Sequence, residues 1–393
     1  LTFKYLNTDK LKFWLFSLLS FSAGLLTYHA AKAFVPLWII YILILVWQKT
    51  HLKYVLKLGF FALILSGSVW LVTSTSTYGQ ARATDMSIFS KNNDVEAKLW
   101  QASIESESQP VLYTRFLNNK LEAYGKDLLQ RYFSHFDPSF LFFNGDLQRA
   151  KHTIPDVGEL LILTLPFFFL GIIFLFKYKL TPIIIFLLLS PLAASLSFET
   201  PSPVRAVFAT AAIATIIALG FLKFAQYIRK YNKYFQYVSF SLVFLIFIWN
   251  TLFYLNSYYI KQPFYNAADW QYEAKEIIQD VTKLQNNYRD IIITANMSGN
   301  PYIFYLFFNK YDPNKWQQQA NNAIETETNS SFIHIRKLDN LTFIGDNCQK
   351  ETEIKEQTLY VCKAGTQPAN LKILKTYYYP NKTESFILGE KVN

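Results

Sequence analysis

The sequence predicts a multi-spanning α-helical membrane protein, with about seven transmembrane helices and a C-terminal extracytoplasmic α/β domain. Three observations lead to this prediction. Of the 393 residues, 51% are hydrophobic and only 17% are charged, whereas an ordinary soluble domain carries about 25% charged residues. The apolar residues are gathered into blocks whose lengths approach the thickness of a bilayer. The lysines and arginines, which give a formal net charge of +10, cluster beside these blocks.

Seven apolar runs are the candidate membrane spans. The first two are short for a hydrocarbon layer of about 30 Å, which requires about 20 helical residues. Pro191 lies inside the fifth run and is expected to kink it. In chain order, the runs are Phe13–Tyr28, Ala33–Trp47, Tyr54–Val72, Val157–Phe176, Pro182–Phe198, Val204–Leu222 and Tyr237–Ile260.

The basic residues of the short connections predict the orientation of these runs. By the positive-inside rule, the side richer in Lys and Arg is cytoplasmic. One side carries Lys4, Lys10, Lys12, Lys49, Lys53, Lys57, Lys177, Lys179, Lys223, Arg229, Lys230 and Lys233. The short connections of the other side carry only Lys32 and Arg205. We therefore expect a protein of the plasma (inner) membrane, with the long polar loop and the C-terminal region outside the cytoplasm.

This reading divides the chain into four parts. Residues 1–75 hold the first three helices, 76–156 form an extracytoplasmic loop, 157–260 hold four more helices, and 261–393 form the α/β domain. Within the loop, Val111–Tyr132 has apolar residues at helical spacing. That spacing fits a helix on the membrane surface, and it fits equally a helix packed on the protein itself.

Helix and strand patterns alternate in the C-terminal part. Asn300 is a candidate N-cap with Pro301 at the first helical position, which favours a helix to Phe308. A second helix is expected at Ala267–Gln285. Strands are expected at Asp290–Ala295, Phe332–Arg336, Leu341–Ile344, Leu359–Cys362, Ile373–Tyr379 and Ser385–Leu388. Cys348 and Cys362 are the only cysteines, and the pattern leaves open a disulfide or two free thiols.

Polar residues near the outer membrane face are the candidate functional groups, because the chain has no Walker loop, no GxSxG and no HExxH motif. If the helices bundle, three connections can converge on one cleft, in which cations would bind a lipid-linked phosphate. The candidates are Tyr28, His29, Lys32, His135, Asp137, Asn144, Asp146, Arg149, Lys151, His152, Glu199 and Arg205.

Each of these residues also has a purely structural interpretation. Lys32 and Arg205 can snorkel to lipid headgroups. His29 and His135 can be hydrogen-bonded structural residues. Asp137 precedes Pro138 and can simply begin a turn. No spacing of His, Cys, Asp and Glu implies a metal or a cofactor, although a divalent ion near a phosphate is compatible with the sequence.

Several segments together resemble the GT-C glycosyltransferases of family 39, the relatives of protein O-mannosyltransferases and aminoarabinose transferases. Tyr28–Pro36 is similar to the family's "YHSxRxxVP" turn. Met86–Phe89, Tyr132–Asp146 and His152–Gly158 resemble its "VSIF … YLSHFSPxFLFxxGD … HsxPGxG" pattern. Further similarity covers Pro203–Arg205, which resembles the "PHxLR" turn, and the segments Asp290–Phe308 and Tyr311–Pro313.

The resemblance implies a membrane transferase that moves a sugar from a polyprenyl-phosphate donor to a protein or glycolipid acceptor. It implies that Lys32, Arg205, His152 and Arg149 bind the donor phosphate. Tyr28, His29, His135, Asn144 and Glu199 would line the same site. Two positions depart from the family pattern. Lys32 replaces an Arg, so that a bidentate phosphate contact becomes a point charge, and Asp156 stands near a usual Gly.

The family's catalytic acidic pair would precede Leu1, and no signal-peptide pattern precedes the first apolar run. We therefore expect an upstream part with the base, and no transfer activity from these 393 residues alone. Asp137 and Asp146 are the weaker alternatives for the base. Expression with the upstream sequence, followed by an assay of sugar release from a polyprenyl carrier, separates these possibilities.

Two other functions remain open from the sequence. A transporter of polyprenyl lipids or glycans would carry ionisable residues inside its helices, and the apolar runs here contain few. A non-catalytic membrane anchor would leave Lys32, His152 and Arg205 without a reason to converge. The expected partners are a polyprenyl-phosphate sugar, an acceptor and membrane lipids. No nucleic acid is expected, because the excess of positive charge is explained by membrane orientation.

Overall fold

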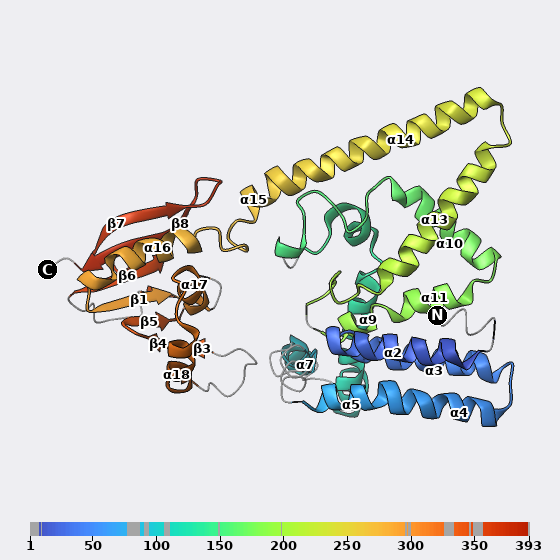
Figure 1. The fold of residues 1–393 in the computed structure, drawn as a ribbon, viewed down its shortest axis with the longest axis horizontal. Helices are drawn as coiled ribbons and strands as arrows, with labels where there is room; N and C mark the ends of the chain where they lie inside the picture. Colours follow the sequence, from blue (N-terminus) through green and yellow to red (C-terminus); the bar gives the residue numbers. More distant parts are fainter. Residues whose placement is uncertain are drawn as a thin grey trace. The chain divides into compact units, whose positions relative to one another are not determined.

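The computed structural model describes residues 8, 10–76, 87–89, 94–105, 111–147, 150–197, 199–294, 297, 300–325, 334–345, 347–348 and 357–391. The chain divides into two compact units, Leu1–Tyr254 and Leu255–Asn393. The first unit is helical, and the second is built on a mixed β-sheet (Figure 1).

All seven apolar runs contain helix. They correspond to α2 (Leu11–Thr27), α3 (Ala31–Trp47), the continuous stretch α4 (Leu52–Ala62), η1 (Leu63–Gly67) and α5 (Ser68–Thr75), α10 (Thr164–Lys177), α11 (Thr181–Leu189) with α12 (Leu192–Ser195), α13 (Ala209–Ile228), and α14 (Lys233–Asn256), which continues through η4 (Ser257–Lys261) into α15 (Gln262–Tyr265).

Membrane association is supported by the lengths of these helices, but the expected count of about seven spans is only partly met. Among the described residues, three stretches are long and apolar enough to cross a membrane: Leu52–Thr75, Ala209–Ile228 and Lys233–Tyr265. The other apolar helices, Leu11–Thr27, Ala31–Trp47, Thr164–Lys177 and Thr181–Ser195, are shorter.

Two of the shorter helices have clear local causes. The fourth run was expected to be helical from Val157, but α10 begins only at Thr164. The residues before it pair with the preceding loop instead, because Leu160 N–H donates to the carbonyl of Leu141 at 2.7 Å. In the fifth run the expected kink at Pro191 is confirmed, since α11 ends at Leu189 and α12 follows the proline.

The closest helix crossing joins α10 to α13 and depends on two glycines. A Cβ added at Gly220 would overlap the main-chain carbonyl of Phe167, and one added at Gly171 would overlap that of Ile216. The two backbones therefore touch directly. Small residues at such crossings are characteristic of helices that pack within lipid. The hydrophobic effect does not drive helices together there, so association depends on close van der Waals contact.

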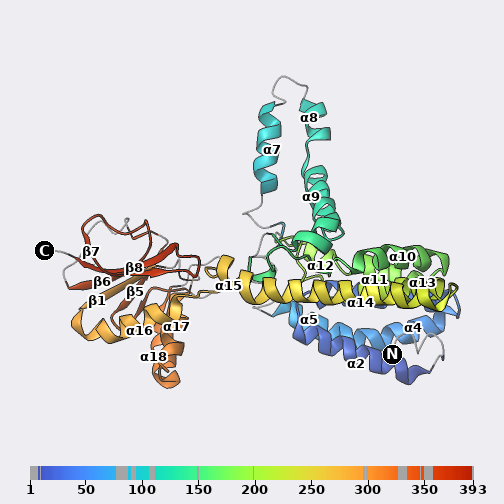
Figure 2. The same cartoon turned by 90° about the horizontal axis from the view of Figure 1, so that it is seen from above.

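A helical hairpin extends from the same unit. It consists of α7 (Asp94–Glu105), α8 (Val111–Leu117) and α9 (Lys120–Ser134), and Figure 2 shows it projecting from the helix bundle. The single helix expected at Val111–Tyr132 is in fact two. The cause is Asn119, whose side-chain oxygen accepts the N–H of Glu122 at 2.9 Å and thereby starts α9 with a new cap.

The C-terminal unit contains a six-stranded sheet in the order β4-β5-β1-β6-β8-β7. The central strand β1 is parallel to β5 and β6, while the β4–β5, β6–β8 and β7–β8 pairs are antiparallel. The strands are β1 (Asp290–Thr294), β4 (Lys337–Leu338), β5 (Leu341–Ile344), β6 (Thr358–Lys363), β7 (Leu371–Tyr378) and β8 (Glu384–Lys391); β2 (Ile324–Glu325) and β3 (His334–Ile335) form a separate pair.

Most of the expected elements of this unit are present. Helix α17 (Pro301–Phe308) and strand β5 have the expected bounds. Helix α16 (Ala274–Leu284) is shorter than expected and is followed by the short 3-10 helix η5 (Gln285–Asn287), because a turn in which Gln271 has φ +50° precedes α16. The strand expected at Phe332–Arg336 ends earlier, and α18 (Pro313–Ala323) was not anticipated.

Side chains on the two faces of the sheet form two apolar clusters. On one face, Ile291 and Ile293 of β1 pack with Ile277 and Ile278 of α16. On the other face, Ile292 packs with Tyr360 and with the cysteines. Because β1 is covered on both faces, its apolar residues are continuous rather than alternating.

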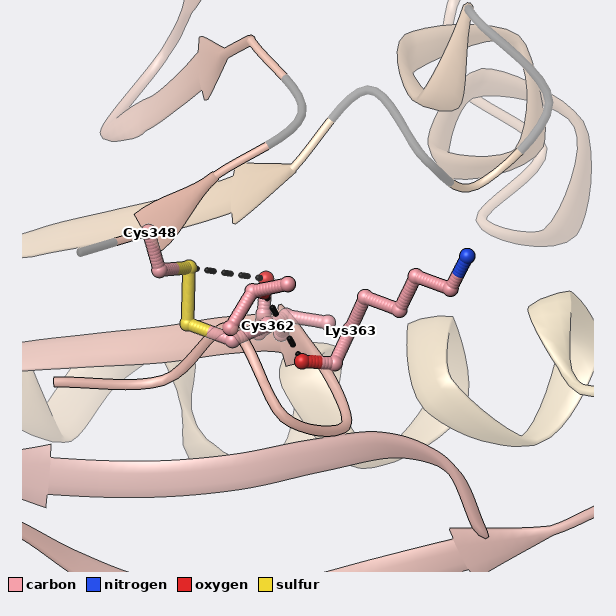
Figure 3. The surroundings of a disulfide bond; sticks show 5 residues. Cys348, Cys362 and Lys363 are labelled. Atoms are coloured by element: carbon pink, nitrogen blue, oxygen red, sulfur yellow. Dashed lines mark hydrogen bonds between the residues drawn. A yellow bond between two sulfur atoms is a disulfide. The ribbon is translucent and has the colours of Figure 1, made fainter. Parts of the chain in front are cut away.

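Cys348 and Cys362 form a disulfide, shown in Figure 3, which decides between the two possibilities that the sequence left open. The bond ties the segment around Cys348 to strand β6, and both cysteines are fully buried.

Candidate functional site

The candidate site lies in the segment that follows α9, where polar residues are held by an unusual backbone. The Asp137 carboxylate accepts the N–H of Ser139 at 2.8 Å and starts the π-helix η2 (Ser139–Asn144). Gly145 then adopts φ +64°, which turns the chain toward Asp146. Asp156 also has a positive φ of 63°, a conformation that Asp tolerates better than most residues.

His135 connects this segment to the connection before α13. The imidazole is only 4% exposed. Its Nε2 accepts the N–H of Ser202 at 3.1 Å, so the ring proton is on Nδ1, which donates to the Arg131 carbonyl at 2.9 Å. Burial lowers the pKa of His135, and the ring is therefore neutral at pH 7. His135 thus acts as a structural link between the two segments.

Arg205 is the centre of the charged cluster. One Nη atom lies 2.6 Å from the Glu199 carboxylate, and the other donates to the Ser197 hydroxyl at 2.9 Å. Burial lowers the pKa of Arg205, and electrostatic interactions with Tyr28 and Asp146 oppose that shift. Arg205 and Glu199 lie in the connection before α13, which the hydrogen bond from Ser202 N–H to His135 joins to the long loop that carries Asp146.

Asp146 is 2% exposed and interacts with groups from both sides of the loop. Its carboxylate lies 3.5 Å from Nδ1 of the half-exposed His152. The Thr153 hydroxyl donates to its main-chain carbonyl. A buried carboxylate requires such partners, because removing an ion from water is costly.

Glu159 is the site residue that the sequence reasoning missed. It lies in the non-helical segment before α10, and a Cβ added at Gly145 would be 3.1 Å from its Oε1. Burial raises the pKa of Glu159 to about 7, and the charge of Asp146 contributes in the same direction. The signal was present in the sequence, because a carboxylate at the start of an apolar run is a functional candidate by position.

Several other candidates lie outside this cluster. Lys32 was expected among the phosphate-binding cations, but its ammonium donates to the Thr73 carbonyl at 2.6 Å, at the end of α5. Asn144 is exposed and donates to Ser139 Oγ at 2.7 Å. His29 is exposed in the turn between α2 and α3, and Asp137 is an exposed turn residue. Arg149 lies outside the described residues.

An apolar cavity of ≈ 140 Å³ lies next to the same loop, against α14. Phe142, Leu160 and Trp249 contribute to its walls, and Asp156 lies at its edge. The position of α14 here is held by Asn250, a buried residue whose side-chain oxygen accepts the N–H of Leu163 at 3.0 Å. The cluster and the cavity thus place charged and apolar surfaces side by side.

The chemistry available to this cluster is anion binding and proton exchange. Arg205 supplies a partly buried guanidinium, and Glu159 supplies a carboxyl group whose pKa of about 7 allows it to take up or release a proton near neutral pH. Within the described part of the chain, no group of three or more His, Cys, Asp or Glu side chains is arranged to hold a metal ion.

Compared with known proteins, the chain matches no family model, and no curated protein and no solved structure is significantly similar to it.

Proposed function

We propose that this protein is a membrane glycosyltransferase that moves a sugar from a polyprenyl-phosphate donor to a protein or glycolipid acceptor at the outer membrane face. The observation that carries the proposal is the partly buried Arg205–Glu199 ion pair, whose connection is joined to the long loop with Asp146 by the hydrogen bond from Ser202 N–H to His135. Residues from two separate connections thereby form one charged cluster at the ends of apolar helices, where a lipid-linked phosphate would be recognised.

The topology that we propose has seven spans, with residues 76–156 and the C-terminal unit outside the cytoplasm. The distribution of Lys and Arg between the short connections supports it. The Cys348–Cys362 disulfide supports it independently, because disulfides persist in oxidising compartments outside the cytosol.

In the proposed reaction, Arg205 binds the phosphate of the donor, assisted by His152. The guanidinium offers several N–H groups in a plane, so a phosphate can share it with Glu199. As the sugar–phosphate bond breaks, the leaving group gains charge that Arg205 stabilises. The adjacent cavity gives the first isoprene units an apolar surface.

The acceptor hydroxyl must lose a proton as its oxygen bonds to the sugar. Within the described residues, Glu159 is the carboxylate best suited to take that proton, because its pKa of about 7 makes it a stronger base than an ordinary glutamate. Asp146 is less suited, since its carboxylate is buried and already lies 3.5 Å from Nδ1 of His152. Asp137 is less suited because it is exposed and bound to Ser139 N–H.

Binding of the lipid carrier tests the proposal without requiring turnover. The full chain in lipid nanodiscs is titrated with a polyprenyl monophosphate and with the corresponding polyprenol. We expect the phosphate to bind more tightly. We expect Arg205→Gln to weaken phosphate binding by about 10–100-fold, the value of a charged hydrogen bond of roughly 1.5–3 kcal/mol, and to leave polyprenol binding unchanged.

A matched control is available in Arg131. It forms a 2.6 Å ion pair with Asp127 at nearly the same exposure as the Arg205–Glu199 pair. Arg131→Gln therefore removes a comparable structural ion pair and should leave the preference for phosphate intact. Equal affinity for the phosphate and the alcohol, or equal losses in the two variants, would contradict the proposed role of Arg205.

A further inference from the structure

Among the described residues, several contacts join the base of the hairpin formed by α7, α8 and α9 to the rest of the helical unit. There, the Tyr132 hydroxyl donates to the Leu188 carbonyl at 2.9 Å, and Arg131 contacts the Thr200 hydroxyl at 3.2 Å. The rings of Phe89 and Tyr124 pack with centroids 5.2 Å apart. These contacts attach the hairpin to α11 and to the connection that contains Arg205.

Beyond its base, the hairpin exposes large apolar side chains. Leu112 and Leu121 are each 85% exposed, Phe116 is 79% exposed and Trp100 is 71% exposed. Leu112 and Phe116 are four residues apart and lie on one side of α8. An apolar surface of this kind on a projecting element indicates an interaction surface rather than part of a core.

The direction of the hairpin indicates which surroundings its exposed apolar side chains contact. Helices α2 to α5 run in the same direction in Figures 1 and 2, and in Figure 2 the hairpin runs crosswise to them and reaches beyond the bundle. It starts at the end of the bundle where α5 ends and where α12 lies. Because the apolar helices define the membrane normal, a hairpin crosswise to them at their ends lies along the membrane surface.

The composition of the hairpin agrees with the lipid–water interface and not with the hydrocarbon core. Residues 94–134 carry five cations and six acids between the apolar positions. Such charges prevent insertion into the hydrocarbon layer, whereas Trp and Phe are favoured at headgroup level. Since the two signs nearly balance, attraction to anionic lipid is not the driving force.

We propose that the α7–α8–α9 hairpin lies in the membrane interface, with Trp100, Leu112, Phe116 and Leu121 inserted among the lipid headgroups of the adjacent leaflet. The inference does not depend on the sugar-transfer proposal. It needs only the membrane-spanning helices, the exposed side chains and the direction of the hairpin.

Site-directed spin labelling of the full chain tests this proposal. Both native cysteines are in a disulfide, so a nitroxide reacts selectively with a single introduced cysteine. The test variants are Leu112→Cys and Phe116→Cys, and the matched control is Glu122→Cys, an exposed polar position at the start of α9. The protein is placed in vesicles of phosphatidylcholine, with and without phosphatidylglycerol.

The expected result is a ratio of oxygen to nickel-chelate accessibility that is several-fold higher at 112 and 116 than at 122, and similar in the two vesicle compositions. Equal ratios at all three positions would place the hairpin in water and overturn the proposal. Protection from both reagents, or dipolar broadening between labels, would show that protein covers the surface, either a second copy or another segment, and would also overturn it.

A second measurement uses the native side chains. Tryptophan emission is quenched by lipids that are brominated near the headgroup. Trp100→Phe should reduce the quenched fraction, whereas Trp316→Phe in α18 of the C-terminal unit, far along the chain from the last apolar stretch, should not. An unchanged quenched fraction in Trp100→Phe would overturn the proposal even if the cysteine variants failed to fold.

Discussion

The two units of this protein use apolar residues in opposite ways. In α16 of the C-terminal unit, Ile277, Ile278 and Val281 are fully buried against the sheet. In α14 of the helical unit, Phe244 and Trp249 are each 61% exposed, and Asn250 is the buried residue. A helix that buries its apolar face against the protein is suited to water. A helix that exposes its apolar face is suited to lipid.

The units also place their charges differently. In the C-terminal unit, ion pairs join the sheet to the helix packed on it, such as Lys375 of β7 with Asp280 of α16 at 2.6 Å. In the helical unit, the partly buried pair Arg205–Glu199 and the buried Asp146 lie in the connections at the ends of helices. Because the structural pair Arg131–Asp127 is equally buried, partial burial of an ion pair does not by itself mark a site; the helical unit differs in that burial and the charge of the buried Asp146 raise the pKa of a second acid, Glu159.

The disulfide provides the largest test of this contrast. Cys348→Ala with Cys362→Ala opens a loop with a sequence separation of 14 residues, and we expect the C-terminal unit to lose about 3 kcal/mol of stability. Hydrogen exchange should increase in β6 and β8 and stay unchanged in α10 and α13. Wild-type protein treated with a reducing agent should behave like the variant. Equal loss of protection in both units would show that they do not unfold separately.

The glycine crossing tests the packing of the helical unit. Ala in a helix interior is usually more stable than Gly by about 0.5–1 kcal/mol. At Gly220 the added methyl overlaps the Phe167 carbonyl, so Gly220→Ala should instead cost about 1–3 kcal/mol through forced separation of α10 and α13. The matched control is Gly24→Ala, where no atom lies within 4 Å of the added Cβ. Unfolding in mixed detergent micelles measures both, and equal effects would contradict the close crossing.

The smallest expected effect concerns Glu159 and is a dependence on pH. Its pKa is about 7 in the folded protein against an ordinary value of 4.5. The folded state therefore holds a proton that the unfolded state has lost between these values, and stability should fall as pH rises from about 4.5 through 7. Glu159→Gln should flatten the dependence of the melting temperature on pH in this range, and the exposed Glu122→Gln should not. A wild-type curve without that slope would show that Glu159 is not protonated near neutral pH.

The sequence predicted the elements well wherever a local pattern was sufficient. The seven apolar runs, the break at Pro191 and the helix that begins at Pro301 all correspond to observed elements, because periodicity and proline act over a few residues. The predicted cap is wrong, since the Asn300 side chain makes no capping hydrogen bond. The predicted start of α10 was wrong, and the break between α8 and α9 was not predicted. Those depend on the pairing of Leu160 with Leu141 and on the cap formed by Asn119, and neither is a periodic signal.

The candidate site was predicted in part. Arg205 and Glu199 were among the selected residues, and the structure pairs them at 2.6 Å. Glu159 was missed, since it was counted within an apolar run, and Lys32 was expected at the site but bonds to Thr73. A side chain's partner depends on where the chain returns in space, which a linear pattern does not contain.

By itself, the amino-acid order determined that long apolar helices precede a mixed α/β unit, because hydrophobic block length and residue alternation are local properties that burial enforces. Only the tertiary structure decided that Cys348 meets Cys362, that Glu159 lies beside Asp146 and that the hairpin runs crosswise to the helices. These are relations between distant segments, and they arise from packing and from the burial of charge rather than from the preference of any single segment.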